Sequence, residues 1–288
     1  MKRGTVPFNY LGVIVSPKRL SILDCQCLVE RVVDRIRGLG SKKLSYARRI
    51  VLIKAVLSTP HCYWAKIFIL PKTMISKIEA ICRKYLWHGT DHKESPSLVS
   101  WDQICKPRKQ GGLGVKDFHV WNLATVRNME HYSITLGYQW LNPDGDVVPW
   151  YPWMLNEWII PKQQFICWLI SHQRLLTQDR LLRMGVIQNN KCFLCGLREE
   201  SLDHLFFACP FNSQCSSLVG DWCRIQMSQL NCIRWWAELR QIAAYKKKVI
   251  PLVLAGLMYH VWLCRNRCRI DGYVIRPKVI LANVKNNV

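Results

Sequence analysis

The sequence predicts a mainly α-helical chain in two parts, and three observations lead to this prediction. Apolar residues recur at helical spacing in most segments, whereas the alternating patterns typical of strands are scarce. Half of the 288 residues are hydrophobic, with 13 tryptophans and 10 tyrosines, which is enough apolar surface for folded domains. A turn-rich stretch near the middle, NPDGDVVPWYPW, indicates a boundary. We therefore expect one domain over residues 1–140 and another over residues 150–288.

Four helices are expected in the first part, each from its apolar spacing and its boundary residues. The first covers residues 23–39, where leucine, valine and isoleucine fall three or four apart with arginines between them. Ser45 can cap the second helix, because its hydroxyl can accept a bond from the first turn, and Pro60 ends this helix. The third covers residues 71–87 and the fourth residues 119–136.

The second part is predicted to contain three further helices around a cysteine-rich stretch. Residues 163–184 form the first, with Gly185 as its stop, because glycine readily adopts the left-handed conformation that ends helices. The other two are expected over residues 211–243 and 247–269. The most apolar run, residues 249–264, is short for a membrane span, so we expect a buried helix and no membrane association.

The chain is strongly basic, with 41 Lys and Arg against 19 Asp and Glu and a formal net charge of +22. Residues 1–120 carry 22 basic and 8 acidic side chains, whereas residues 121–190 carry 5 of each. An excess of this size repels itself in a compact protein, which indicates a polyanionic partner. The predicted partner is RNA or DNA, bound through its phosphates and therefore with little sequence selectivity.

Two basic clusters in the first half are the candidate phosphate contacts. One lies around the start of the second helix and the other around the glycine-rich sequence GGLG. The candidate nucleic-acid-binding residues are Lys42, Lys43, Arg48, Arg49, Lys54, Lys106, Arg108, Lys109 and Lys116. The alternative is a solvated helix face that only keeps the protein soluble. Trp101 and Trp121 flank the second cluster, where they either stack on unpaired bases or, as we expect, pack in the core.

The sequence KCFLCGLREESLDHLFFACP contains a pattern typical of a metal site, with the spacing Cys192-x2-Cys195-x8-His204-x4-Cys209. A tight turn can point both thiolates of a Cys-x2-Cys pair at one ion, and a short helix capped by Ser201 can bring the other two ligands together. Three thiolates and one imidazole favour Zn²⁺ and leave no position for water, so the predicted zinc is structural. The alternative is that these cysteines are ordinary small core residues.

No catalytic machinery is recognised in the sequence, and the chain is predicted not to be an enzyme. Two-metal phosphoryl transfer needs converging carboxylates, but the one close aspartate pair, Asp144 and Asp146, lies in a Pro-Gly turn. The Gly-x4-Gly-Lys-Ser/Thr loop that binds nucleotide phosphates is absent, and so is the Gly-x-Ser-x-Gly nucleophile elbow.

The cysteine content bears on the expected compartment. Fourteen cysteines would suggest disulfides in a secreted chain, but no apolar run follows the basic N-terminal residues as it would in a signal peptide. We therefore expect an intracellular protein, in the nucleus or the cytoplasm and not secreted, with free or metal-bound thiols.

Several stretches carry a resemblance to a known family. It is strongest in YLGVIVSPKRL, in the run from KKLSYARRIVLIKAV to RKYLWHG, and in VSWDQICKPRKQGGLGVKDFHVWNLA. These resemble the region downstream of the polymerase core in plant LINE-type (non-LTR) retrotransposon reverse transcriptases. KCFLCGLREESLDHLFFACPF is similar to the zinc-binding domain that follows in that family, and GLMYHVWLCRNRCRI to the helix after it. The family's polymerase motif, Tyr-x-Asp-Asp, does not occur here, and Arg48 and Arg49 stand where the family commonly has Gly-Arg.

The resemblance implies a helical segment like a polymerase thumb or connection over residues 1–140, followed by a small helical zinc-binding domain of reverse-transcriptase type. It implies RNA-directed DNA polymerase activity for a full-length member of the family but not for these residues. The predicted function is therefore non-catalytic RNA or DNA binding with a structural zinc site. Two alternatives stay open. One is a protein-interaction module stapled by zinc that docks through the tryptophan-rich residues 150–168, and the other is a retrotransposon remnant without function.

Overall fold

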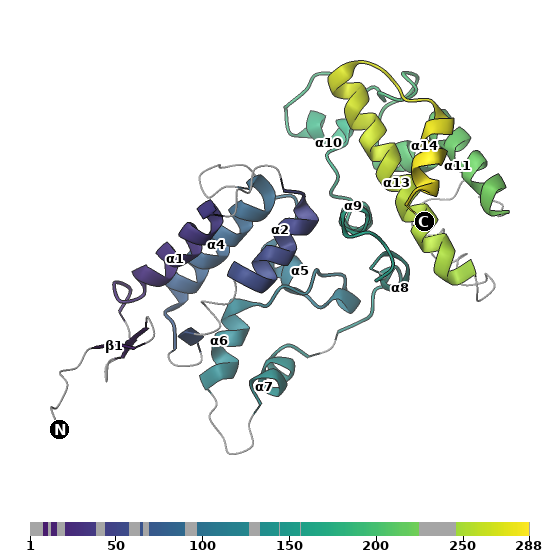
Figure 1. Ribbon diagram of the computed structural model, residues 1–288. Coiled ribbons are helices and arrows are strands. Elements are labelled where there is room, and N and C mark those ends of the chain that lie inside the picture. Colours follow the sequence, from purple (N-terminus) through teal and green to yellow (C-terminus); the bar gives the residue numbers. More distant parts are fainter. Residues whose placement is uncertain are drawn as a thin grey trace, which may run out of the picture. The chain divides into compact units, whose positions relative to one another are not determined.

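The computed structural model divides into two compact units, Met1–Val148 and Pro149–Val288, which are described one at a time (Figure 1). The division falls inside the turn-rich stretch near the middle of the sequence. The described residues are mainly helical, which confirms the predicted fold class. They are residues 8–10, 13–15, 21–38, 44–57, 64–65, 69–89, 97–126, 133–143, 145–155, 157–224 and 246–287.

Unit 1 begins with a short strand pair that the sequence did not predict. β1 (Phe8–Tyr10) and β2 (Val13–Val15) pair in antiparallel register. The two long helices that follow pack against each other: α1 (Gln26–Gly38) lies on α4 (Lys72–His88), and each contributes apolar residues at helical spacing to the core. α4 ends at Gly89, whose φ of 71° is the left-handed conformation that glycine adopts without strain.

The second helix of unit 1 begins where its capping residue predicts. The backbone N–H of Arg48 donates to the Ser45 hydroxyl at 3.4 Å, so Ser45 caps α2 (Tyr46–Leu52) as predicted. The helix continues directly into the π-helical segment η2 (Ile53–Leu57). Its predicted end, Pro60, lies outside the described residues.

The remainder of unit 1 consists of shorter elements. They are α5 (Trp101–Cys105), the 3-10 helix η3 (Arg108–Gln110), α6 (Phe118–Val126) and α7 (Ile134–Leu141). The single helix predicted over residues 119–136 was wrong in extent, because two helices that pack against each other occupy this region and residues 127–132 between them lie outside the described part.

Unit 2 is built around one long helix. Its elements are α8 (Tyr151–Met154), α9 (Pro161–Ser171), α10 (Gln178–Arg183), the π-helical segment η4 (His204–Ala208), α11 (Pro210–Cys223), α13 (Lys246–Asp271) and α14 (Pro277–Lys285). α13 contacts α8, α9, α11 and α14, and its apolar side chains form the centre of the unit together with the fully buried Trp168 of α9.

The helices of unit 2 differ from the sequence prediction in three places. The helix predicted over residues 163–184 is two helices, α9 and α10, because the chain turns at Gln173, where φ is 53°. The helix predicted over residues 211–243 ends at Cys223, where Arg224 has a φ of 53°, and residues 225–245 lie outside the described part. α14 was not predicted, although Pro277 at its start and the buried pair Ile280 and Val284 are helical signals.

α13 contains the most apolar sequence of the chain. By length and composition alone, the segment Lys248–Asp271 could cross a membrane, with a mean hydropathy of 1.3 in its most apolar window. However, 61% of that window is buried inside the unit, which is typical of the core helix of a folded domain. The prediction of a buried helix at residues 247–269 is therefore confirmed.

A buried carboxyl group in unit 1 couples stability to pH. Glu79 of α4 is 9% exposed, and its carboxylate lies 3.7 Å from Nε2 of His119. Burial, reinforced by the negative charge of Asp117, raises the pKa of Glu79 to about 7. Between its ordinary value of 4.5 and about 7, the folded protein therefore binds a proton that the unfolded chain has released. The free energy of unfolding should fall as pH rises through this window.

Replacement of Glu79 by glutamine tests this coupling. We expect Glu79→Gln to raise the unfolding temperature of unit 1 at about pH 8, where the native carboxylate is charged, and to change it little at about pH 5. Thermal melts followed by circular dichroism at both values measure the difference. Glu30→Gln, on the exposed side of α1, is the matched control and should show no such dependence. Equal effects of Glu79→Gln at both pH values would contradict the raised pKa.

Candidate metal centre

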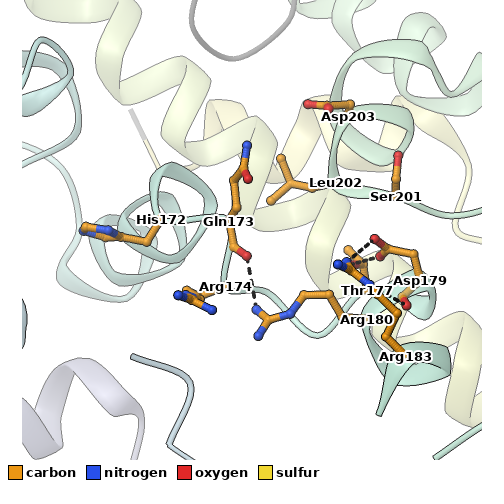
Figure 2. Close-up of a pocket in the computed structure, with 10 residues that line it drawn as sticks. All are labelled: His172, Gln173, Arg174, Thr177, Asp179, Arg180, Arg183, Ser201, Leu202 and Asp203. Atoms are coloured by element: carbon orange, nitrogen blue, oxygen red, sulfur yellow. Dashed lines mark hydrogen bonds and ion pairs between the residues drawn. The ribbon is translucent and has the colours of Figure 1, made fainter. Parts of the chain in front are cut away.

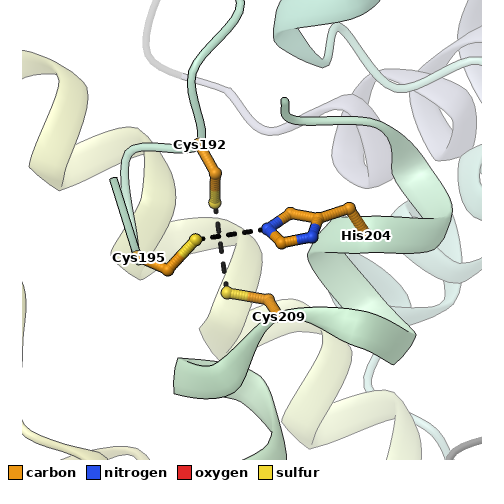
Figure 3. A group of neighbouring side chains, drawn as sticks. All are labelled: Cys192, Cys195, His204 and Cys209. Carbon is orange, nitrogen blue, oxygen red and sulfur yellow. Dashed lines mark hydrogen bonds between the residues drawn. The ribbon is translucent and has the colours of Figure 1, made fainter. Parts of the chain in front are cut away.

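The four residues of the predicted metal site lie together in unit 2. The sulfur atoms of Cys192, Cys195 and Cys209 and a ring nitrogen of His204 all lie within 4.8 Å of one another (Figure 3). Sγ of Cys195 is 3.3 Å from Nε2 of His204, and the sulfurs of Cys192 and Cys209 are 4.0 Å apart. The ligand atoms therefore converge on one point, although they come from positions up to 17 residues apart.

The first two ligands are held by a tight turn. The N–H of Gly196 donates to the carbonyl oxygen of Cys192 at 2.8 Å, and Gly196 has a φ of 65°, which a residue with a side chain rarely adopts. The N–H of Cys192 donates in turn to the carbonyl oxygen of Arg198 at 2.8 Å, and Lys191 and Glu199 form an isolated antiparallel bridge. The turn thus places Cys192 and Cys195 on one side of the loop.

The other two ligands are positioned by helix ends. The Ser201 hydroxyl accepts a hydrogen bond from the N–H of His204 at 3.0 Å, as predicted for the cap of this short helical segment. Cys209 directly follows η4 and is the N-cap of α11, so its side chain lies at a helix start. Both residues are buried, whereas Cys195 is half-buried.

Backbone N–H groups favour the thiolate form of two cysteines. The N–H groups of Phe211 and Asn212, in the first turn of α11, donate to the sulfur of Cys209, and those of Leu194 and Cys195 donate to the sulfur of Cys192. The sulfurs of Cys192 and Cys209 also share a hydrogen bond, and this contact lowers the pKa of Cys209 and raises that of Cys192. Cys209 therefore loses its proton first.

The histidine is kept in the neutral form that binds metals. Burial lowers the pKa of His204, and the positive charge of Arg198 lowers it further. Neutral imidazole carries a free lone pair, which is the form that coordinates a metal ion.

Two of the distances between the ligand atoms fit the edges of a tetrahedral site. Bond lengths of about 2.3 Å to sulfur and about 2.0–2.1 Å to nitrogen give tetrahedral edges of about 3.8 Å between sulfurs and about 3.6 Å between sulfur and nitrogen. The distances of 4.0 Å and 3.3 Å lie within a few tenths of an ångström of these edges. The set of three cysteines and one histidine fits Zn²⁺ and fills all four positions of a tetrahedral site.

A buried ion pair ties the cysteine-rich loop to α13, and the sequence analysis did not find it. Arg265 lies on α13 and donates to both carboxylate oxygens of Glu200, with Nη2 to Oε1 at 2.6 Å and Nε to Oε2 at 3.1 Å. The two side chains are 1% and 0% exposed. Glu200 also accepts a hydrogen bond from the backbone N–H of Gln178 at 3.0 Å. Glu200 stands between Cys195 and His204 in the sequence, so this pair anchors the loop that carries the ligands.

Three further contacts strengthen the same anchor. The guanidinium of Arg265 lies over the rings of Trp262 and Phe193, 5.0 and 5.5 Å from their centroids. The Cys268 thiol donates to the carbonyl oxygen of Phe193 at 3.2 Å. The one sequence signal of this anchor is the position of Arg265 directly after a long hydrophobic run.

The predicted phosphate contacts around α2 are not equally accessible. Arg48 is exposed, but Arg49 is 7% exposed and donates to the carbonyl oxygen of Leu86 at 3.0 Å. Burial lowers the pKa of Arg49, which also lies 5.3 Å from the ring centroid of Tyr46. Arg49 therefore joins α2 to the end of α4 and is unavailable to a phosphate in this structure. Lys42 and Lys43 lie outside the described residues.

The second predicted cluster lies on a loop with a well-defined backbone, residues 106–116, which we call the basic loop. Gly112 approaches the backbone of Lys106 so closely that a Cβ atom would lie 1.9 Å from its carbonyl oxygen. The N–H groups of Leu113 and Gly114 donate to the carbonyl oxygens of Ile104 and Lys106 at 3.0 and 2.9 Å. The glycines therefore serve the close packing of the loop on itself.

The four basic side chains of this loop are exposed, whereas Lys54, which contacts the loop from η2, is not. Lys106, Arg108 and Lys109 are exposed. Lys116 is exposed too, with its ammonium group 3.7 Å from the ring centroid of Trp121. Lys54, by contrast, is half-buried and donates to the carbonyl oxygen of Leu113, and burial lowers its pKa to about 8. Lys54 thus fixes the backbone of the basic loop through this hydrogen bond.

Most of the tryptophans that the sequence offered for base stacking or for a protein partner and that are named below are buried. Trp101 and Trp121 are 4% and 8% exposed, so they pack in the core of unit 1, as expected, and are unavailable for base stacking. In the tryptophan-rich stretch 150–168, Trp168 is fully buried, whereas Trp158 is 63% exposed. Trp168 is therefore not accessible to a partner, whereas Trp158 is.

Comparison with known proteins agrees with the site. Residues 132–215 match the family model described as zinc-binding in reverse transcriptase, and this range contains all four clustered residues. The chain is also 36% identical over 99 residues to an Arabidopsis thaliana protein named "Putative ribonuclease H protein". That similarity covers 34% of this chain and 16% of the relative. No solved structure matches the chain.

Proposed function

We propose that this protein binds RNA or DNA through its basic surface without catalysing a reaction, and that one structural Zn²⁺ holds unit 2 in its fold. The observation that carries the proposal is the convergence of Cys192, Cys195, His204 and Cys209 inside a segment that matches a zinc-binding domain of reverse transcriptases. All four tetrahedral positions are taken by protein ligands, so the ion would have no free position for water or substrate.

The nucleic-acid part of the proposal rests on charge and rigidity. Lys106, Arg108 and Lys109 project from the basic loop, whose backbone is fixed by its own hydrogen bonds and by Lys54. Exposed cations on a fixed loop lose little conformational freedom when they neutralise phosphates, and the released counterions drive binding. The formal net charge of +22 supports a polyanionic partner.

The biological setting is part of the same proposal. We propose a relationship to LINE-type retrotransposon reverse transcriptases of plants, with residues 1–140 as the thumb- or connection-like segment and an intracellular location. The resemblance of the N-terminal stretches and the similarity to a protein of Arabidopsis thaliana support this relationship.

A triple substitution in the basic loop tests the binding function. We expect Lys106→Ala/Arg108→Ala/Lys109→Ala to weaken binding of a fluorescent single-stranded RNA, because three phosphate contacts are lost. The slope of log K against log salt concentration should become shallower by about 2, at about 0.7 for each lost contact. Fluorescence anisotropy of the full chain over a range of salt concentrations measures both quantities.

The matched control removes the same charge elsewhere in unit 1. Arg31 on α1 and Lys72 and Lys77 on α4 are exposed, and their triple alanine variant should keep most of the salt dependence. Equal losses in both triple variants would show that only net charge matters and not the basic loop. Binding that does not respond to salt would contradict the proposal and favour a protein-interaction module.

A further inference from the structure

A cavity of about 340 Å³ opens in unit 2 beside the candidate metal centre. Figure 2 shows its lining, which comes from the turn 172–174, from α10 and the residue before it, and from residues 201–203. The last of these segments leads directly to His204, so one wall of the cavity belongs to the cysteine-rich loop. The cavity and the proposed zinc ligands therefore share a structural element.

Three arginines line the cavity, and two of them make no ion pair with another described residue. Arg183 pairs with Asp179, with Nη2 to Oδ2 at 2.9 Å. Arg180 instead donates from Nη1 to the backbone carbonyl oxygen of Gln173 at 3.2 Å. Arg174 is exposed, and its guanidinium has no partner within the described part of the chain. The cavity therefore holds positive charge that the described residues do not neutralise.

The arginines repel one another in this arrangement. Burial lowers the pKa of Arg180, and the charges of Arg174 and Arg183 lower it further. The one other carboxylate of the lining, Asp203, lies on the wall opposite the arginines in Figure 2. An anion between the guanidinium groups would offset the repulsion and could accept several charge-assisted hydrogen bonds.

The backbone at the edge of the cavity is strained, which is an independent observation. Gln173 has a φ of 53°, a conformation that usually requires glycine. Its N–H donates to the carbonyl oxygen of Ile170 at 2.9 Å, and the next N–H, of Arg174, donates to that of Leu169 at 2.8 Å. This is the bonding pattern of a glycine helix stop, formed here without glycine. Strained residues of this kind cluster at ligand sites, and this turn aims Arg174 and the carbonyl that holds Arg180 at the same cavity.

We propose that Arg174 and Arg180 bind a phosphate group of an RNA or DNA backbone in this cavity. The proposal rests on the proposed nucleic-acid binding and adds a contact site in unit 2, apart from the basic loop of unit 1. Guanidinium groups suit this task because their planar donors match the oxygens of a phosphate. A free phosphate ion presents the same chemistry, so the experiment must distinguish the two sources.

Chemical modification of arginines provides a direct test on the full chain. We expect phenylglyoxal to modify Arg174 rapidly in the free protein, and a single-stranded RNA oligonucleotide to protect it at least several-fold. Peptide mass spectrometry measures the modified fraction at each arginine. Arg267 and Arg269, both exposed on α13, are internal controls that RNA should protect less.

Affinity measurements test the same contacts by substitution. Arg174→Ala/Arg180→Ala should make the slope of log K for single-stranded RNA against log salt shallower by about 1.4, at about 0.7 for each lost phosphate contact. Arg267→Ala/Arg269→Ala is the matched control and should leave most of this slope. Because Arg180 contacts the backbone, Arg174→Ala alone is also measured, and about half the effect is expected from an exposed residue whose loss leaves the fold intact.

The outcomes separate this inference from the proposed function. Protection of Arg174 by RNA together with the shallower slope supports the phosphate site. Salt-sensitive RNA binding without either effect overturns it and leaves the proposed function standing. If the chain binds no RNA but inorganic phosphate protects Arg174, the proposed function fails and the cavity is a free-anion site. Protection by neither overturns the site altogether.

Discussion

Replacement of Cys192 by serine is expected to remove zinc and to destabilise unit 2 strongly. The purified chain should contain one Zn²⁺, and the variant much less, because a hydroxyl is a poor ligand for this ion. Structural zinc contributes about 10–16 kcal/mol of apparent binding free energy in zinc-finger peptides, which exceeds the stability of many whole domains. The core around α13 adds stability of its own, so we expect a loss of at least about 3 kcal/mol and a fall of about 10 °C or more in the unfolding temperature.

Metal analysis and thermal unfolding together measure this effect. Cys167→Ser is the matched control, since Cys167 is also a buried cysteine of unit 2 but lies on α9 outside the cluster. It should keep one Zn²⁺ per chain. A chelator should reproduce the Cys192→Ser result in the native protein, and substitution by Co²⁺ should give the absorption typical of tetrahedral thiolate ligation. A native chain that melts at the same temperature with and without chelator would contradict a structural zinc.

The second large effect is expected from the ion pair between Arg265 and Glu200. Arg265→Ala leaves the carboxylate of Glu200 buried with no cation, and breaking such a pair costs about 3–5 kcal/mol. The variant should unfold at a lower denaturant concentration, as measured by chemical denaturation. We also expect weaker zinc binding, because Glu200 anchors the loop between Cys195 and His204.

A double-mutant cycle distinguishes the pair from general packing at the same position. Glu200→Gln/Arg265→Met removes both charges and keeps side chains of similar volume, so it should be markedly less destabilised than the sum of Glu200→Gln and Arg265→Met. Arg265→Lys keeps the charge but loses the two-pronged contact and the stacking on Trp262, so its stability should fall between the native protein and Arg265→Ala. Additive losses in the cycle would argue against a coupled ion pair.

The sequence predicted those elements whose signals are local. Ser45 identifies the start of α2, and the spacing of Leu28, Val32 and Ile36 identifies α1, because a cap and an apolar stripe are properties of a few consecutive residues. The same local reasoning failed at Gln173, where a residue other than glycine takes the left-handed conformation and ends α9. No propensity rule indicates such a stop, since residues with a side chain rarely adopt the left-handed conformation.

The sequence predicts the candidate metal site better than it predicts which residues of the basic clusters are accessible. The four ligands lie within 18 consecutive residues, 192–209, so turn geometry and two caps suffice to bring them together. The availability of a basic side chain depends on distant contacts instead. Arg49 is taken up by the carbonyl of Leu86, 37 residues away, and Lys54 by that of Leu113, 59 residues away.

By itself, the sequence determined the helical character of the chain, its basic charge and the identity of the clustered cysteines and histidine. All of these depend on residue type and short-range spacing. Only the tertiary structure decided which cations face solvent, which arginine pairs with Glu200 and which ones share a cavity. Arg265 and Glu200 are 65 residues apart, and the turn 172–174, α10 and the cysteine-rich loop meet only after the unit has folded. Burial determines whether a charge binds a partner outside the protein or one inside it, and burial is set by contacts between segments that are far apart in the sequence.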